Sequence, residues 1–402
     1  MPFLFVCVVL LMLAPHAVWS VFFYDEASNH TLDLRMGRKQ VETALRYLEA
    51  HRFREAMTAA KQQGYTIRGF YHTSIWRGGA EWKAVMAEQL GLVDGKREHL
   101  NNIYDRESSL EDNIEWGKKQ WPSLLRVSDK LHVTVSGTSR ADLDKVVSYV
   151  DELGLSHRDK LSFTYNQTQE RGAFHKLSQA DRDRLVRDRP NLSEGESATF
   201  MALHDYCSAQ SRRGRKALVY YFHLKGSCCT RRTEQLSKRH VTTWREAMNA
   251  FTLEFPSICL RAMVDGYDSC GMENQGGTYS GNFWWATCDH VARVPQLTDL
   301  EKFDAYKVEY AIQKYSSDAS KNEDLGAKCG YSAYNCNANH YTVECTRSSY
   351  LHKLLQYSQL QALPYNFEGT KGEWVWNQKQ REYDVFKPKI LEECRKRRER
   401  PL

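Results

Sequence analysis

The sequence lacks the motifs that mark several large classes of nucleotide-binding enzymes. No glycine-rich dinucleotide fingerprint and no phosphate-binding Gly-Lys-Ser/Thr loop follows any of its strand-like segments. These absences argue against a nucleotide-dependent redox enzyme and against an NTP hydrolase. Charge is not concentrated either, because 56 basic and 50 acidic residues are spread along the chain and leave a net charge of +6. Without a basic patch, nucleic acid is not an expected partner.

Long apolar runs are also missing beyond the first 20 residues, so no later segment approaches the roughly 20 apolar residues that a membrane-spanning helix needs. Residues 1–20 hold a shorter apolar run from Phe3 to Leu13, followed by Pro15. This pattern predicts a cleaved signal peptide, with an uncleaved signal anchor as the alternative. Only the anchor would bring the chain to a membrane. In both cases the body faces the secretory pathway lumen or is secreted.

Cysteine is scarce in the first half of the chain and frequent in the second. Apart from Cys7, all ten remaining cysteines fall between Cys207 and Cys394. In an oxidising compartment this even number predicts up to five disulfide bonds. Cys329, Cys336, Cys345 and His340 form an alternative zinc set, but their spacing matches no common zinc finger. Glycan acceptor triplets, which fit a glycoprotein, begin at Asn29, Asn166 and Asn191.

Strand-like and helix-like segments alternate from residue 65 onward. The strand-like segments are 65–72, 131–135, 161–165 and 217–222, and the helix-like ones are 80–91, 139–153, 196–209 and 243–255. The last strand is almost wholly apolar, as expected for a central strand buried on both faces. The alternation predicts an α/β fold with a mainly parallel sheet flanked by helices, whose ligands bind at the carboxyl ends of the strands.

The same pattern predicts how the chain is divided. We expect a signal segment (1–20), an N-terminal helical extension (21–64), one α/β domain (65–300) and a helical, disulfide-rich C-terminal extension (301–402). A polar, charge-rich insertion at 93–122 shows no strong period and is expected at the surface.

Two cationic motifs follow the apolar strand. In "YYFHLKG", His223, Lys225 and Gly226 leave its carboxyl end, where a cation can neutralise a phosphate and glycine lets the backbone approach a ligand. Arg245 follows Trp244 at the start of the next helix and can hold a phosphate or carboxylate. The alternatives are ordinary turn residues in the first motif, and a buried Trp beside a surface Arg in the second.

Two acidic residues stand in "DGYDSCG". Asp265 and Asp268 can bind a divalent cation or serve as a general base. Turns also favour Asp and Gly for conformational reasons, so a structural role stays open.

Two adjacent tryptophans end the run of unusual motifs, in "YSGNFWWA". Side chains of neighbouring strand residues point to opposite faces, so Trp284 or Trp285 can line a cleft while the other packs inward. Ser280, Gly281 and Asn282 precede them as turn residues, and Asn282 can hydrogen-bond sugar hydroxyls. An indole ring stacks well on the apolar face of a sugar. Core packing of both rings is the alternative.

Taken in order, "YYFHLKG", "WREAMNAF", "LRAMVDGYDSCG" and "YSGNFWWATCDHVARVP" resemble a glycosyltransferase-like family of protists, algae and bacteria. The run is more distantly similar to the rhamnan-synthesis protein F family, which shares a His-x-Lys element and a later Gly-x-x-Phe-Trp-Ala block. The resemblance covers roughly residues 65–350 and is strongest over 219–295. No Asp-x-Asp follows an apolar strand, which departs from the usual glycosyltransferase pattern.

The resemblance implies a GT-A-like fold and transfer of a sugar from a nucleotide sugar to a glycan or glycoprotein acceptor. In this hypothesis Lys225, His223 and Arg245 neutralise the diphosphate, and Asp265 or Asp268 acts as base or metal ligand. A divalent cation such as Mn²⁺ and metal-independent action both stay open. Two other classes also remain: a secreted carbohydrate-binding protein without transferase activity, and a disulfide-stabilised structural protein with buried tryptophans.

Overall fold

The computed structural model of the chain describes most of the residues between 38 and 298 and little beyond them. The described residues are 6–8, 21–23, 38–75, 81–96, 123–168, 177–188, 193, 195–224, 235–272, 274–275, 278–298, 301–303, 312, 329–334, 388, 391–392 and 394–396. Lys225, Gly226, the predicted insertion after residue 96 and most of the C-terminal extension lie outside this set.

A mixed sheet of seven strands forms the centre of the body, in the order β11-β7-β10-β6-β3-β4-β5. The strands are β3 (Thr66–Ser74), β4 (Lys130–Gly137), β5 (Leu161–Gln167), β6 (Ala217–His223), β7 (Ser269–Met272), β10 (Trp284–Thr287) and β11 (Gly330–Tyr334). Strands β6, β3, β4 and β5 are mutually parallel, whereas β10 is antiparallel to both of its neighbours, β6 and β7. The predicted α/β class and the parallel half of the sheet are confirmed.

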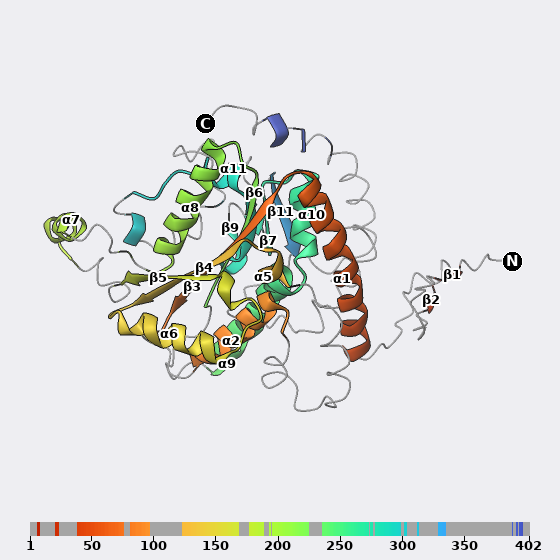
Figure 1. Cartoon of the computed structure of the whole chain (residues 1–402), viewed down its shortest axis with the longest axis horizontal. Coiled ribbons are helices and arrows are strands. Elements are labelled where there is room, and N and C mark those ends of the chain that lie inside the picture. Colours follow the sequence, from red (N-terminus) through yellow and green to blue (C-terminus); the bar gives the residue numbers. More distant parts are fainter. Residues whose placement is uncertain are drawn as a thin grey trace.

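Helices cover both faces of this sheet (Figure 1). One face carries α2 (Glu81–Asp94), α5 (Leu124–Val127), α6 (Ala141–Glu152), α9 (Gln235–Asn249), the π-helical turn η3 (Ala250–Glu254) and α10 (Ser257–Asp265). The other face carries α8 (Ser197–Arg212) and α11 (Cys288–Val291). Each face has its own apolar core, and all seven residues of β6 are buried between the two. The prediction of a central strand at this position is therefore confirmed.

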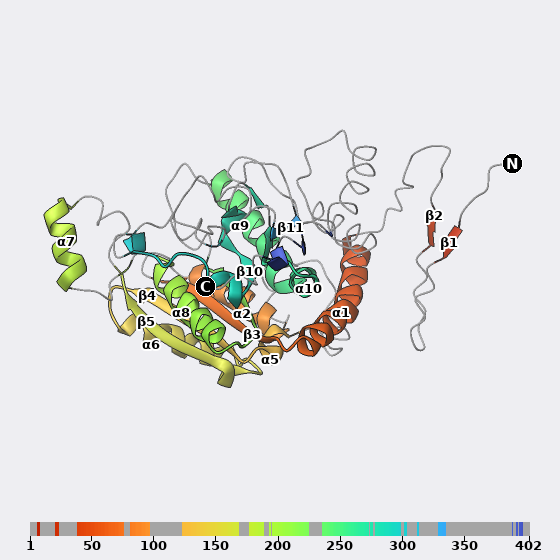
Figure 2. The ribbon, with the colours of Figure 1, turned by 90° about the horizontal axis from the view of Figure 1, so that it is seen from above.

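Smaller elements complete the described chain. They are the pair β1 (Val6–Val8) and β2 (Val21–Phe23), the hairpin β8 (Asn274–Gln275) and β9 (Thr278–Tyr279), helix α7 (Gln179–Asp188), and the 3₁₀ turns η1 (Arg158–Lys160), η4 (Ser280–Asn282) and η5 (Glu301–Phe303). Helix α7 stands to one side of the sheet in both views (Figures 1 and 2) and packs against Phe303 of η5. None of the described helices combines the length and apolar composition needed to span a bilayer.

The predicted N-terminal helix is α1 (Arg38–Gln62), and it packs on α10. Glu49 of α1 is 4% exposed, and its carboxylate accepts a hydrogen bond from the backbone N–H of Ser257 at 2.8 Å. The Ser257 hydroxyl donates to the second carboxylate oxygen. Because Ser257 is the first residue of α10, Glu49 takes the place of an N-cap for a helix far along the chain.

This contact makes the stability of the protein depend on pH. Burial raises the pKa of Glu49 from 4.5 to about 8, although the Ser257 hydrogen bonds oppose the rise. The unfolded chain therefore loses this proton at lower pH than the folded chain, and stability falls as pH rises from 4.5 to about 8. We expect Glu49→Gln to remove a few kcal/mol of the stability change across this window, measured by urea unfolding at a series of pH values. Glu55→Gln, at an exposed site of the same helix, should keep it, and an unchanged slope in Glu49→Gln would refute the account.

Three disulfide bonds join the described elements. Cys207–Cys288 links α8 to α11, Cys259–Cys270 links α10 to β7, and Cys329–Cys394 links the start of β11 to the C-terminal segment. The expectation of disulfide bonding is confirmed for these six cysteines. The zinc alternative loses Cys329, because its sulfur is bonded to Cys394.

Candidate functional site

The order of the parallel strands creates a crevice between β3 and β6. The crossovers from β3 to β4 and from β4 to β5 run through α2 and α6 on one face, while the crossover from β5 to β6 runs through α8 on the other. The connections therefore diverge where β3 lies beside β6. Ligands of doubly wound sheets bind outside the carboxyl ends of the strands at such a point. His72 on β3 pairs in register with His223 on β6, so both lie at this edge.

His223 is fixed between two hydrogen-bond acceptors. Its Nδ1 lies 3.2 Å from the carboxylate of Glu196, and its Nε2 lies 2.9 Å from the backbone carbonyl of Gly281. The Gly281 carbonyl can only accept, and so can the ionised carboxylate of Glu196, so beside that carboxylate both contacts are hydrogen bonds only when both ring nitrogens carry protons. The geometry therefore favours the charged imidazolium. Its side chain is 6% exposed, and the ring meets Phe283 edge-on at 4.9 Å.

Glu196 gathers several elements around this histidine. It lies at the N-cap position of α8, where the helix dipole favours a negative charge. Its carboxylate accepts hydrogen bonds from the hydroxyl of Tyr221 at 2.8 Å and from the side-chain amide of Asn282 at 2.7 Å. Sequence reasoning treated Glu196 only as a helix start. The signal that points to it is an acidic residue at the beginning of the helix that leads into the apolar strand.

His72 contributes a neutral ring to the same edge. Its Nδ1 lies 3.0 Å from the hydroxyl of Thr199 on α8. The pKa of His72 is lowered from 6.5 to about 4, chiefly by burial; the charge of Glu196 opposes this shift and the neighbouring His223 adds to it. The two histidines at the ends of β3 and β6 therefore differ in character: His72 is uncharged near neutral pH, and His223 is held by a carboxylate.

The turn before β10 is held in an unusual backbone conformation. Gly281 and Asn282 both have positive φ values, 72° and 61°, and Asn282 is the non-glycine residue with positive φ in the described chain. Asparagine tolerates this left-handed region better than most residues. Its side chain is also anchored, because its carbonyl oxygen accepts a hydrogen bond from the indole of Trp284 at 2.8 Å. Strain of this kind is concentrated at functional sites.

Gly281 also has to be glycine for steric reasons. A Cβ atom there would lie 2.0 Å from Sδ of the buried Met248 and 3.2 Å from the ring of Trp244. We expect Gly281→Ala to cost about 1–3 kcal/mol more unfolding free energy than Gly154→Ala. Gly154 has a similar φ of 57° with open space around it, so its substitution carries the backbone strain alone. Urea unfolding measures the loss of unfolding free energy in both variants. Equal losses would show that the steric contact with Met248 adds no cost.

A chain of buried hydrogen bonds ties the end of β6 to α2 and α9. The side-chain amide of Gln89 donates to the backbone carbonyl of His223 at 3.0 Å and to the side-chain Oδ1 of Asn249 at 3.1 Å. Asn249 in turn donates to Glu88 at 2.6 Å, and Arg245 reaches the same carboxylate at 3.4 Å. All four residues are at most 5% exposed. The network fixes the backbone of His223 from the opposite face of the sheet.

Arg245 therefore lies deeper than the sequence suggested. Its guanidinium is part of this buried network and forms an ion pair with Glu88. Its neighbour Trp244 is buried as well, next to Gly281. The structure brings Arg245 to the carboxyl half of the sheet, but as part of the support beneath His223.

The two tryptophans are both core residues in the structure, so the expectation that one of them lines a cleft is not met. Trp284 and Trp285 are fully buried on opposite faces of the sheet. Trp284 stacks on Tyr221 at 5.2 Å, and Trp285 lies 4.9 Å from Tyr220. The indole N–H of Trp285 donates to the carbonyl of Thr252 at 2.9 Å. With both ring faces covered, neither presents a stacking surface. Ser280 lies in η4, before β10, and only its backbone is described.

Asp265 and Asp268 lie at the wrong edge of the sheet for the predicted role. They precede β7, which runs parallel to β6, so they stand at its amino end. The carbonyl of Asp268 accepts a hydrogen bond from Thr287, which pairs with Leu218 at the start of β6. Five residues separate Leu218 from His223, or about 17 Å along the strand. The interpretation of these aspartates as base or metal ligand beside His223 is wrong.

The amino edge near Asp268 offers no ordinary metal site either. Among the described residues, Asp268, Cys329 and Cys394 bring three potential ligand atoms within 4.8 Å of one another. The two sulfurs are bonded to each other, so they are not thiolate ligands in this structure. Asp265 pairs instead with Arg261 at 2.9 Å on the surface of α10.

The described chain is thus an α/β protein of the doubly wound type, with a polar cluster at its switch point. Residues 157–338 match the model of a family described as a domain of unknown function (DUF8361). The match begins just before β5 and ends just after β11, so it includes Glu196, His223 and Asn282 but not β3 or β4. No curated protein and no solved structure matches the chain.

Proposed function

We propose that the chain is a glycosyltransferase-like enzyme of the secretory pathway with a GT-A-like fold. It would transfer a sugar from a nucleotide-sugar donor to a glycan or protein acceptor. The observation that carries the proposal is the charged pair of His223 and Glu196 at the switch point between β3 and β6. A doubly wound sheet binds nucleotides at this place, and the proposal puts the diphosphate there. The three disulfides are compatible with the lumen.

The chemistry of such a transfer needs positive charge at the departing diphosphate. The bond between the sugar and the diphosphate breaks, and the diphosphate leaves with the electron pair. His223, held as an imidazolium by Glu196, supplies one fixed charge at the end of β6. Lys225, which follows Leu224 in the sequence, supplies a second in this proposal. Arg245 acts indirectly, because it lies in the buried network that supports the backbone of His223.

A divalent cation would offer the same stabilisation if it bound the diphosphate. The proposal leaves Mn²⁺ dependence to experiment, and it no longer includes Asp265 or Asp268. A donor-hydrolysis screen across common nucleotide sugars, with and without Mn²⁺, tests activity, donor and metal need together. Hydrolysis of at least one donor is expected. Failure with every donor under both conditions would contradict the enzyme proposal.

The competing classes are separated by what the protein binds. A carbohydrate-binding protein would need an exposed tryptophan ring on which a sugar can stack, and both rings are buried. A disulfide-stabilised structural protein agrees with that burial and remains the second candidate. Titration with UDP, GDP and CMP distinguishes it, since an enzyme of the proposed kind should bind at least one nucleotide saturably. A structural protein should bind none.

A further inference from the structure

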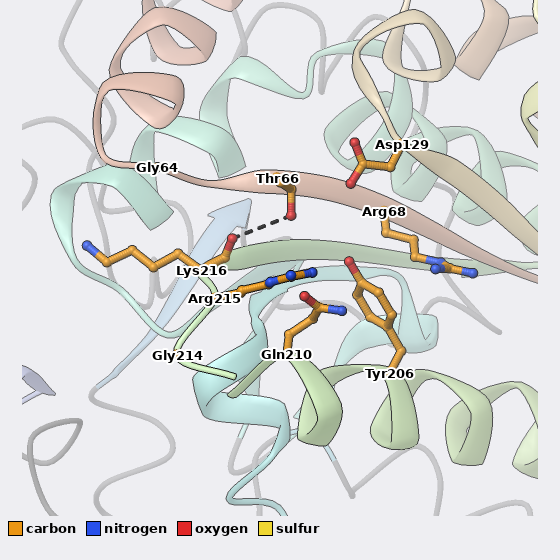
Figure 3. A pocket seen from close by; sticks show the side chains of 9 residues that line it. All are labelled: Gly64, Thr66, Arg68, Asp129, Tyr206, Gln210, Gly214, Arg215 and Lys216. Atoms are coloured by element: carbon orange, nitrogen blue, oxygen red, sulfur yellow. Dashed lines mark hydrogen bonds between the residues drawn. The ribbon is translucent and has the colours of Figure 1, made fainter. Parts of the chain in front are cut away.

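A separate polar cleft lies at the amino edge of the same sheet (Figure 3). Its volume of about 530 Å³ lies within the range of small-molecule sites. The lining comes from the turn before β3, β3 itself, the start of β4, the end of α8 and the turn into β6: Gly64, Thr66, Arg68, Asp129, Tyr206, Gln210, Gly214, Arg215 and Lys216. Thr66 lies six residues before His72 on β3, so the cleft is about 20 Å from the site of His223.

Arg68 brings a guanidinium group from β3 to this cleft. Its guanidinium lies over the ring of Tyr206 at 4.5 Å and near that of Phe70 at 5.8 Å. Its Nε is buried and has no hydrogen-bond partner among the described residues. A ligand in the cleft would therefore meet the other nitrogens of the guanidinium, which can donate to an anionic oxygen.

Arg215 brings a second guanidinium to the same space. Helix α8 ends at Arg212, and Gly214 follows with a φ of 62°. The backbone N–H of Arg215 donates to the carbonyl of Gln210 at 3.0 Å. This turn directs the Arg215 side chain alongside Gln210 toward Tyr206, whereas the Lys216 side chain extends away from the cleft (Figure 3). Arg215 and Arg68 therefore bring positive charge to the cleft from the two sides of Tyr206 (Figure 3).

The opposite wall carries a negative charge and neutral polar groups. Asp129 lies across the cleft from Arg215, and its carboxylate is exposed (Figure 3). A bare inorganic anion would be repelled by this carboxylate and would fill only part of the volume. A ligand with hydroxyl groups would instead donate to Asp129 and exchange hydrogen bonds with Gln210.

We propose that this cleft binds an acidic sugar unit, that is, a small organic anion that also carries hydroxyl groups. Arg215 holds its carboxylate or phosphate, Arg68 adds positive charge beside Tyr206, and Asp129 and Gln210 bind its hydroxyls. The site is distinct from the candidate active site, and the proposal does not depend on sugar-transfer activity.

Calorimetric titration of the full chain with glucose 6-phosphate and with glucuronate tests the proposal. We expect saturable binding of at least one of them to one site, and at least tenfold weaker binding by Arg215→Ala. Arg213→Ala removes an equally exposed arginine from the same turn without touching the cleft, and it should bind like the wild type.

Neutral glucose and inorganic phosphate complete the test. Both should bind much more weakly than the acidic sugars, because each lacks one of the two recognised features. Equal affinity for inorganic phosphate would overturn the sugar assignment, and equal affinity for glucose would overturn the role of the arginines. Absence of binding by both acidic sugars, or equal losses in the Arg213 and Arg215 variants, would overturn the proposal itself.

Discussion

Glu88→Ala is expected to lower the free energy of unfolding by about 3–5 kcal/mol. The carboxylate is 2% exposed and receives hydrogen bonds from Asn249 and Arg245. Removing it leaves the buried guanidinium without this counter-charge, and arginine cannot neutralise itself by losing a proton. Asn249 loses its strongest contact as well. Chemical unfolding in urea measures the loss.

Matched variants show whether the ion pair or general packing is responsible. Glu152→Ala removes an exposed glutamate near the end of α6 and should change stability by about 0.5 kcal/mol or less. The double variant Glu88→Leu with Arg245→Met replaces both charges by apolar groups and should recover much of the loss. If the double variant lost as much stability as the single variants Glu88→Leu and Arg245→Met lose together, the buried ion pair would not be the cause.

His223→Ala is expected to lower donor turnover by about a hundredfold or more while the protein stays folded. The substitution removes the fixed imidazolium between Glu196 and the carbonyl of Gly281, and with it one of the charges that face the diphosphate in the proposed reaction. Turnover of the hydrolysed donor is the measurement, with thermal melting to confirm folding. His157→Ala, before η1 and away from this edge, should keep normal turnover. Near-normal turnover in His223→Ala would remove His223 from the mechanism.

Glu196→Gln separates a positioning role from a purely structural one. The amide keeps the shape of the side chain but removes the charge that favours the imidazolium. As the pH is raised, turnover of this variant should therefore fall at a lower pH than turnover of the wild type. A loss that is the same at every pH would indicate that Glu196 only supports the fold.

Much of the parallel half of the sheet follows from local patterns. Strands β3, β4, β5 and β6 and helices α2, α6 and α8 lie where alternating and helical periods predict them. The apolar composition of β6 also identifies its central place, because a strand covered on both faces has no polar side. These features depend on a few neighbouring residues, so a single sequence is enough to find them.

The site depends on long-range placement, which local patterns do not contain. Glu196 reaches His223 only because the crossover from β5 to β6 runs on the face that carries α8. Asp268 resembles a catalytic residue in sequence, but the parallel direction of β7 puts it at the amino edge. Trp284 is covered by Tyr221 because β10 inserts beside β6 in reverse. Each outcome follows from strand order and direction.

The most direct test of the central claim is hydrogen exchange of the full chain with and without a saturating nucleoside diphosphate. If the diphosphate binds at the switch point, amides at residues 72–75, 223–224 and 281–283 should become protected, while residues 64–68 and 214–217 at the opposite edge should not change. Protection confined to the opposite edge, or saturable binding without any change at the ends of β3 and β6, would contradict the proposed site.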